Sequence, residues 1–219
     1  MNTSGGATSP WRDVLAEMTD HLPLWHRRPV ATNERQITMD VADYFSDLEA
    51  HEGCCTWLYC DDRGNATTGI GNLVPDADAC AALPWLGNDD PRDAYTRVLN
   101  AFGPTKPAAS VYLGISDLRL SLDFVANLVG QRLETEFLPG IQRLCPGFDG
   151  FPLSARRALV DMAYNLGVHG LAKFPVMLAA CNSGDWATAA KQCHRATCRD
   201  TRNAWTAQMF VDASVASNS

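Results

Sequence analysis

The feature of the sequence that most constrains its fold is a short change of pattern between two helical regions. Residues 56–60 have strand propensity, residues 61–65 are turn formers, and residues 66–70 return to strand propensity. Before this stretch, residues 38–51 show helical apolar spacing, and Gly53 stands where a left-handed residue would end that helix. The sequence therefore predicts an α+β fold in which a small β-hairpin lobe accompanies a larger helical lobe.

The larger lobe is predicted from the second half of the chain, where apolar residues recur at helical spacing. The apolar stripe that begins at Ser121 is expected to end before Pro139. Ser154 and Asp185 are expected to cap later helices, and Gly167 is expected to end one of them. The predicted helices cover residues 10–22, 38–51, 93–102, 121–138, 154–167, 174–181, 186–193 and 201–211.

A chain of 219 residues suits one domain or one bilobed unit. Residues 1–36 are expected to form an N-terminal extension with one short helix, ahead of a domain that spans residues 37–219. Within that domain we expect the helix and hairpin over residues 37–75, a variable insertion over residues 76–120 and the helical lobe over residues 121–219.

Composition argues against two classes of protein. The 18 Lys and Arg against 25 Asp and Glu give a net charge of −7, which disfavours a general nucleic-acid binder. No apolar run approaches the roughly 20 residues of a membrane span, and the first ten residues lack the layout of a secretory signal. We therefore expect a compact domain with no stable membrane insertion and no signal peptide.

Eight cysteines leave the redox state of the chain open. Eight cysteines permit about 105 disulfide pairings, so none is assigned, and buried free thiols remain an equal alternative. No Cys-x-x-Cys pair occurs, and His51, His169 and His194 show no metal-ligand spacing. We expect neither a metal nor a cofactor.

Two carboxyl side chains, Glu52 and Asp61, flank the predicted change from helix to hairpin. Glu52 lies at the end of the helix, where exposed carbonyls disfavour an ionised carboxylate and so favour the protonated form that a general acid needs. Asp61 follows at the end of the first predicted strand. One neutral and one ionised carboxyl across a groove form the arrangement of a glycosidase, and Thr67 offers a hydroxyl that could hold a water.

Each of these residues also has a plainer interpretation. A glutamate before a helix-ending glycine is usually a surface residue. Asp61 and Asp62 can both stabilise the turn through hydrogen bonds to the backbone, and a threonine in a strand commonly reflects β-propensity alone. The residues by themselves leave both interpretations open.

The spacing of these residues resembles the catalytic motif of the phage-type lysozymes, glycoside hydrolase family 24. The residues that carry the resemblance are Glu52, Gly53, Tyr59, Asp61, Gly64, Thr67, Gly69, Ile70 and Gly71. Residues 156–174 and 186–190 resemble later helices of that family, and residues 202–210 resemble its last helix more loosely. The resemblance covers residues 40–73 and 120–211, and it implies a lysozyme-like fold with a cleft between the two lobes.

The resemblance also implies a reaction. The family cleaves the β-1,4 bond between N-acetylmuramic acid and N-acetylglucosamine in peptidoglycan with inversion, which requires carboxyls roughly 6.5–9.5 Å apart. By resemblance Glu52 is the general acid, Asp61 positions or deprotonates the attacking water, and Thr67 holds that water. The residues that the resemblance implies for substrate binding are Tyr164, Asn165, Asn72 and Leu73.

The sequence departs from the family pattern at several places. Asn72 stands where the family commonly has a histidine that supports the catalytic glutamate, and an asparagine cannot supply charge. The link over residues 74–120 is longer than usual, and residues 1–36 have no counterpart. These departures keep an alternative open, in which a lysozyme-like module binds peptidoglycan or a partner without turnover.

Peptidoglycan lies outside the cytoplasmic membrane, so the resemblance raises the question of delivery. A phage endolysin reaches the wall through holin-type membrane lesions, whereas a bacterial antagonistic effector is carried by a secretion system. The cysteine count and the unmatched N-terminus favour an effector that acts in the periplasm or at the cell wall. We expect a monomer with peptidoglycan as its substrate and a specific immunity protein as its partner.

Overall fold

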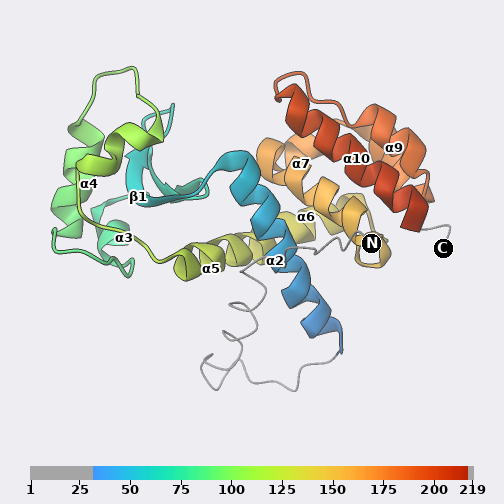
Figure 1. Ribbon diagram of the computed structural model, residues 1–219, viewed down its shortest axis with the longest axis horizontal. Helices are drawn as coiled ribbons and strands as arrows, with labels where there is room; N and C mark the ends of the chain where they lie inside the picture. Colours follow the sequence, from blue (N-terminus) through green and yellow to red (C-terminus); the bar gives the residue numbers. More distant parts are fainter. Residues whose placement is uncertain (1–31, 217–219) are drawn as a thin grey trace, which may run out of the picture. The chain divides into compact units, whose positions relative to one another are not determined.

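The computed structural model describes residues 32–216 of the chain (Figure 1). The helix predicted over residues 10–22 lies outside the described residues. The described part combines many helices with one small antiparallel sheet, which confirms the predicted α+β class with a small β lobe and a larger helical lobe.

The chain forms two compact units. Unit 1 comprises the described residues up to His51 and those from Arg132 onward, and unit 2 comprises Glu52–Gln131. Unit 1 contains α2 (Thr32–Glu52) except for its last residue, Glu52, which belongs to unit 2. Its other elements are the π-helical turn η3 (Leu133–Phe137), α6 (Leu138–Leu144), the 3-10 turn η4 (Phe148–Gly150), α7 (Leu153–Leu171), α8 (Pro175–Ser183), α9 (Trp186–Gln192) and α10 (Asp200–Ala216). The elements of unit 2 are β1 (Cys55–Cys60), β2 (Ala66–Gly69), β3 (Asn72–Leu73), α3 (Ala77–Ala81), α4 (Pro91–Asn100), the 3-10 turn η2 (Ala109–Gly114) and α5 (Leu122–Arg132). The last residue of α5, Arg132, belongs to unit 1.

The predicted hairpin is present in unit 2. β1 pairs antiparallel with β2, with Tyr59 opposite Thr67 and Cys60 opposite Ala66, and the register shifts once earlier in β1. The turn is closed by a backbone hydrogen bond from Gly64 N to Asp61 O at 3.0 Å. Turn formers between two short strands therefore identified this element correctly.

A third strand, β3, was not predicted from the sequence. It pairs antiparallel with β2, with Thr68 opposite Asn72. Gly69 and Gly71 both have positive φ, at 63° and 68°, so the chain reverses within four residues. The predicted second strand extends through Ile70, but the reversal at these glycines ends β2 at Gly69.

The region predicted as a variable insertion, residues 76–120, folds as part of unit 2. Cys80, Val98 and Tyr112 from this region are buried in one cluster with Leu58 and Cys60 of β1. α4 begins where Asp90 accepts hydrogen bonds from the backbone of Arg92 and Asp93, close to the helix predicted over residues 93–102. α3 and η2 were not predicted, because they are short and are held by this cluster.

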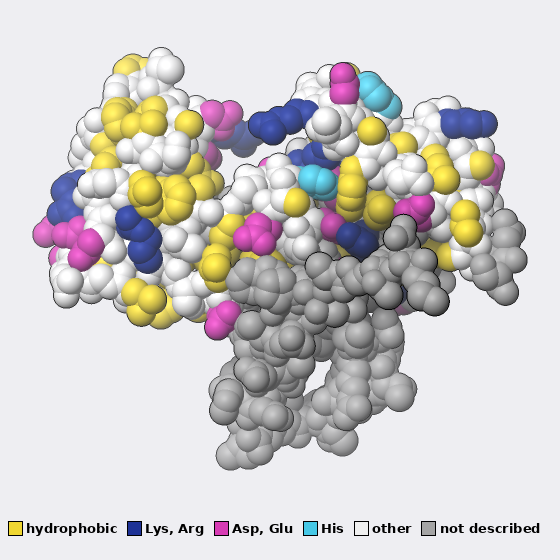
Figure 2. Space-filling view, in the orientation of Figure 1, with side chains coloured by type: hydrophobic (Ala, Val, Ile, Leu, Met, Phe, Trp, Pro, Cys, Tyr) yellow, Lys and Arg dark blue, Asp and Glu magenta, His cyan; other side chains and the backbone are white. Residues whose placement is uncertain are grey.

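The same region also exposes apolar surface. Large exposed apolar side chains within residues 76–120 are those of Leu86, Val111 and Leu113. Figure 2 shows hydrophobic side chains gathered on the visible face of unit 2. Unit 2 therefore has both a core that includes the hairpin and an apolar surface outside it.

Unit 1 is organised around α7. Leu159, Met162 and Ala163 are fully buried, as predicted, and α10 packs against both α7 and α9. The predicted cap of α9 is confirmed, since Asp185 Oδ1 accepts a hydrogen bond from Thr188 N at 3.0 Å.

Two residues predicted to mark helix boundaries in unit 1, Pro139 and Ser154, do not mark them. Pro139 does not end the apolar stripe: the π-helical turn η3 precedes it, and Pro139 lies in the first turn of α6, where its missing N–H is tolerated. Ser154 lies inside α7 rather than at its cap, which is Pro152. The end predicted at Gly167 is confirmed, since Gly167 leaves helical geometry with φ 71° and ψ 161°, and a second short helical segment follows it to Leu171.

All eight cysteines lie within the described residues, and the structure has them as free thiols. Five of them are buried, so burial of free thiols accounts for most of the cysteine content. Among the described helices, none combines the length and the apolar character needed to cross a membrane.

The packing of α6 on α7 yields a first prediction. A Cβ added at Gly140 would meet both γ-carbons of Val168, the farther of them at 2.7 Å. We expect Gly140→Ala to lower the free energy of unfolding by about 1–3 kcal/mol, because overpacking outweighs the gain of about 1 kcal/mol in helix propensity. Urea unfolding followed by circular dichroism measures this change.

Gly150→Ala is the control, since a Cβ there meets nothing within 4 Å. The double variant Gly140→Ala/Val168→Ala should recover part of the lost stability. If Gly140→Ala were as stable as the wild type, the described contact between α6 and α7 would be wrong.

Candidate active site

Glu52 is the last residue of α2, and its side chain is exposed. Gly53 follows with φ 77°, so the predicted left-handed end of this helix is confirmed. A Cβ at Gly53 would meet nothing within 4 Å, so a glycine is needed here for its backbone conformation rather than for space. The chain thus passes from helix to sheet directly after the candidate general acid.

Asp61 lies in the β1–β2 turn, and its carboxylate is engaged there. Oδ1 accepts hydrogen bonds from Arg63 N at 3.0 Å and from Asn65 N at 2.7 Å, and Oδ2 accepts one from Asn65 Nδ2 at 3.0 Å. These contacts are the turn-stabilising role that the sequence left open for this residue. A carboxylate offers about four lone-pair positions, so three such bonds leave room for one more donor.

Thr67 lies in β2 and is only 4% exposed. Its hydroxyl donates to Asn65 O at 3.1 Å, and the same carbonyl accepts from Asp61 N at 2.9 Å. Asn65 therefore joins the two predicted catalytic residues of the hairpin through its backbone and its side chain. The structure brings Asp61 and Thr67 together at one end of the sheet.

The two predicted substrate-binding residues of unit 2 form β3. Asn72 is 7% exposed and lies beside Gly69, where its Nδ2 would be 2.9 Å from an added Cβ. Leu73 is 61% exposed and pairs with Thr67. Leu73 thus presents apolar surface next to the hairpin, whereas the side chain of Asn72 is buried, although β3 is an edge strand.

The other two predicted substrate-binding residues lie on α7 in unit 1. Arg132 Nη1 donates to Tyr164 Oη at 3.0 Å, and the guanidinium lies 5.0 Å from the centre of the Tyr164 ring. Phe137 packs against the same ring at 5.0 Å. Tyr164 is therefore engaged with protein groups on its ring, whereas Asn165 is exposed and accepts from Arg195 Nη1 at 3.3 Å.

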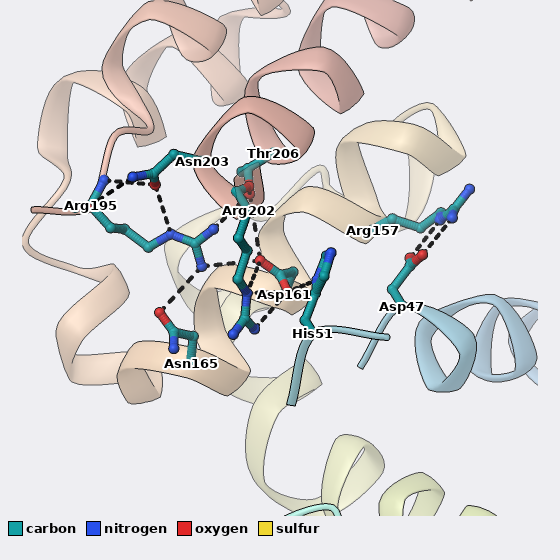
Figure 3. Close-up of polar contacts among 9 residues, drawn as sticks. All are labelled: Asp47, His51, Arg157, Asp161, Asn165, Arg195, Arg202, Asn203 and Thr206. Atoms are coloured by element: carbon teal, nitrogen blue, oxygen red, sulfur yellow. Dashed lines mark hydrogen bonds and ion pairs between the residues drawn. The ribbon is translucent and has the colours of Figure 1, made fainter. Parts of the chain in front are cut away.

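A buried polar network in unit 1 was missed by the sequence reasoning (Figure 3). At its centre is Asp161 of α7, which is 1% exposed. Oδ1 accepts from Arg202 Nη2 at 2.7 Å and lies 2.8 Å from His51 Nδ1, and Oδ2 accepts from Arg195 Nη1 at 3.0 Å. One buried carboxylate therefore holds three basic side chains from three parts of the chain.

Each of the three nitrogens of the Arg195 guanidinium has an acceptor. Beyond Asp161, Nη2 donates to Thr206 Oγ1 at 2.7 Å, and Nε reaches Asn203 Oδ1 at 3.4 Å. Asn203 in turn donates to Arg195 O at 2.9 Å. A side chain that is 2% exposed thus has a partner on each side, as a buried charge requires.

The protonation of Asp161 reflects these partners. Burial by itself raises the pKa of Asp161, whereas the hydrogen bonds from His51 and Arg202 and the charges of Arg202 and Arg195 lower it. The partners prevail, and the pKa falls to about 2. Asp161 is therefore ionised throughout the neutral and mildly acidic range.

A second pair joins α2 and α7, the two helices that carry His51 and Asp161. Arg157 of α7 donates to Asp47 of α2 through Nε at 2.7 Å and Nη2 at 2.6 Å. Burial raises the pKa of Asp47 despite these hydrogen bonds, and the hydrogen bonds to Asp47 raise the pKa of Arg157. The pair is bidentate, the geometry in which an arginine binds a carboxylate most specifically.

The comparisons with known proteins add nothing to these observations. No protein-family model matches the chain, and no curated protein matches it. Within the described residues, no group of three or more His, Cys, Asp and Glu side chains is arranged to hold a metal. The site is therefore described by its own geometry alone.

The buried network yields a prediction for stability against pH. The pKa of Asp161 lies below its ordinary value of 3.8, so its contribution to stability is present above that value and is lost as the pH falls toward about 2. Asp161→Asn should lower the free energy of unfolding at pH 7 by about 3–5 kcal/mol, since it leaves buried cations uncompensated.

The difference between wild type and Asp161→Asn should then narrow by about 2 kcal/mol between pH 5 and pH 2, as measured by urea unfolding at each pH. Asp212→Asn, on the exposed face of α10, is the matched control and should follow the wild type throughout. A constant difference across this range would contradict the ionised, buried state of Asp161.

Proposed function

We propose that this protein is a peptidoglycan muramidase of the phage-type lysozyme kind. The observation that carries the proposal is the hairpin after Glu52, in which Asn65 joins Asp61 to Thr67. The left-handed Gly53 and the Tyr59–Thr67 register support it, because both occur at the positions that the sequence resemblance requires.

In the proposed reaction Glu52 donates a proton to the glycosidic oxygen as the bond to C1 of the muramic acid breaks. A water attacks C1 from the opposite face, and Asp61 accepts the proton that this water loses. Thr67 orients the water through its hydroxyl. The three donors around Asp61 support its part in the mechanism, since they hold the carboxylate in one orientation.

Substrate binding is proposed for Tyr164, Asn165, Leu73 and Asn72. Leu73 and Asn165 are exposed, so they are accessible to a glycan. Asn72 would act from the edge strand β3 with a largely buried side chain. Tyr164 would act through its edge or hydroxyl, because Arg132 covers part of its ring. An amide such as that of Asn165 can donate to and accept from an acetamido group.

The proposal extends to the setting in which the enzyme works. We propose that it acts as a monomer in the periplasm or at the cell wall, after delivery by a secretion system or through holin-type lesions. An immunity protein is the partner expected of an antibacterial effector. A pull-down from the producing cell with the wild-type protein would test for that partner.

Replacement of the proposed general acid gives the most direct test. Glu52→Gln should lower the release of muropeptides from purified peptidoglycan by at least about 100-fold, because an amide cannot donate the proton. Mass spectrometry of the digest measures the products, and a reducing muramic acid end identifies the bond that is cut.

Glu49→Gln, three residues earlier on α2, is the matched control and should retain activity. Equal release by wild type and Glu52→Gln would overturn the assignment of Glu52. An anhydro end in place of a reducing end would change the proposed reaction from hydrolysis to intramolecular transfer.

A neighbouring pair of aspartates separates catalysis from turn formation. Asp61→Asn should lower activity by about 100-fold or more, whereas Asp62→Asn, at the exposed next position, should leave it nearly unchanged. Because Asp61 also stabilises the turn, thermal unfolding is measured in parallel. Loss of activity only above the unfolding temperature of Asp61→Asn would show that the residue serves the turn alone.

A second candidate function is favoured by one observation. The carboxylate of Asp61 and the hydroxyl of Thr67 are both engaged within the turn, as in a hairpin that serves structure only. The chain would then be a lysozyme-like module that binds peptidoglycan or a partner without turnover. Sedimentation of the wild-type protein with cell walls, without any product across a pH series, would favour this function.

A further inference from the structure

Two pairs of polar side chains, each an acid with a base, hold the C-terminal part of α2 to α7 in unit 1. Asp47 pairs with Arg157, and His51 pairs with Asp161, as Figure 3 shows. The residues on each helix are four positions apart, so each helix presents its two groups on one face. We call these four residues the α2 clasp.

A third helix closes the clasp. The Trp205 ring of α10 meets the His51 ring edge-on, with centroids 4.6 Å apart, and lies 5.9 Å from the Arg157 guanidinium. The four side chains of the clasp are at most 28% exposed. Little water reaches these pairs, so their electrostatic interactions are only weakly screened.

The polarity of the clasp alternates, and this determines the register of α2. The helix α2 supplies the acid of one pair and the base of the other. A slip of α2 by one turn in either direction would place Asp47 against Asp161 or His51 against Arg157. Such a slip would lose two favourable pairs and juxtapose two groups of the same type.

A gain in the free energy of unfolding does not by itself explain why acid and base alternate in the α2 clasp. A buried ion pair adds little to stability compared with apolar residues of similar size, because desolvation offsets its attraction. What an alternating set of acidic and basic groups adds is a single favoured alignment of two helices. The α2 clasp is therefore suited to setting the position of α2 along α7.

We propose that the α2 clasp positions Glu52 for catalysis, an inference that rests on the proposed muramidase function. Glu52 directly follows His51, at the point where the chain leaves unit 1. His51 and Glu52 are adjacent in the last turn of α2, so holding His51 in place restricts where the backbone of Glu52 can lie. Displacing a catalytic group by about 1 Å costs about 100-fold in rate, which sets the scale of the effect.

Two sets of variants test the positioning role. His51→Ala should lower kcat about 10- to 100-fold on soluble peptidoglycan chains while KM changes less than about threefold. His51→Asn, whose amide N–H₂ lies close to the position of Nδ1, should recover a large part of kcat. Asp47→Arg should also lower kcat, and the exchange Asp47→Arg/Arg157→Asp should leave kcat low, because it restores one pair but puts two bases on α2 and two acids on α7.

Gly140→Ala controls for loss of stability. It is expected to destabilise unit 1 without touching the clasp, so its kcat should match that of the wild type below its unfolding temperature. Hydrogen exchange at the amides of residues 51–53 supplies a readout besides activity. It should be faster in His51→Ala than in wild type or in Gly140→Ala.

The outcomes separate the two claims. If wild type is active and Glu52→Gln is not, but His51→Ala retains the wild-type kcat, the positioning role is overturned and the proposed function stands. If the charge exchange restores the wild-type kcat in a folded protein, the alternation of acid and base in the clasp has no part in positioning. An inactive wild type overturns both claims, since Glu52 then has no reaction to be positioned for.

Discussion

A single buried carboxylate, that of Asp161, determines how the helices of unit 1 meet. It accepts from Arg195 and Arg202 and pairs with His51, so α7, α10, the segment before α10 and the end of α2 converge on two oxygen atoms. Transfer of an ion from water into a protein interior is costly unless every hydrogen-bonding position is supplied. The network therefore permits one arrangement of these helices, because any other leaves a buried charge without a partner.

The parts of the fold that were predictable from the sequence depend on local signals. The hairpin follows from turn formers between two strands. The end of α2 follows from Gly53, and the beginning of α9 follows from Asp185. β3 and α3 escaped prediction because two- and five-residue elements have no periodicity of their own and are held by tertiary packing. The end predicted before Pro139 was wrong because a proline in the first turn of a helix lacks only a hydrogen bond that would be absent anyway.

The residues of the candidate site also fall into those that a local pattern predicts and those that depend on distant partners. Spacing along the chain was enough to single out Glu52, Asp61 and Thr67, and the structure joins the last two through Asn65. Asp161 was not singled out, although an aspartate amid the buried residues of α7 is itself a signal that cationic partners must lie nearby. Its partners are up to 110 residues away in the chain, and no local pattern could name them.

The position of Glu52 explains why long-range charges matter to a site whose motif is local. Glu52 is exposed, so burial does not restrain its side chain, and the position of its backbone limits what that side chain can reach. On one side that backbone is a helix held by His51 and Asp161; on the other it is the left-handed turn at Gly53. Asn72 cannot supply the charge that a histidine would bring from the sheet. Under the proposed function, the carboxylate of Asp161 on α7 therefore orders this end of the site through its contact with His51, the residue before Glu52.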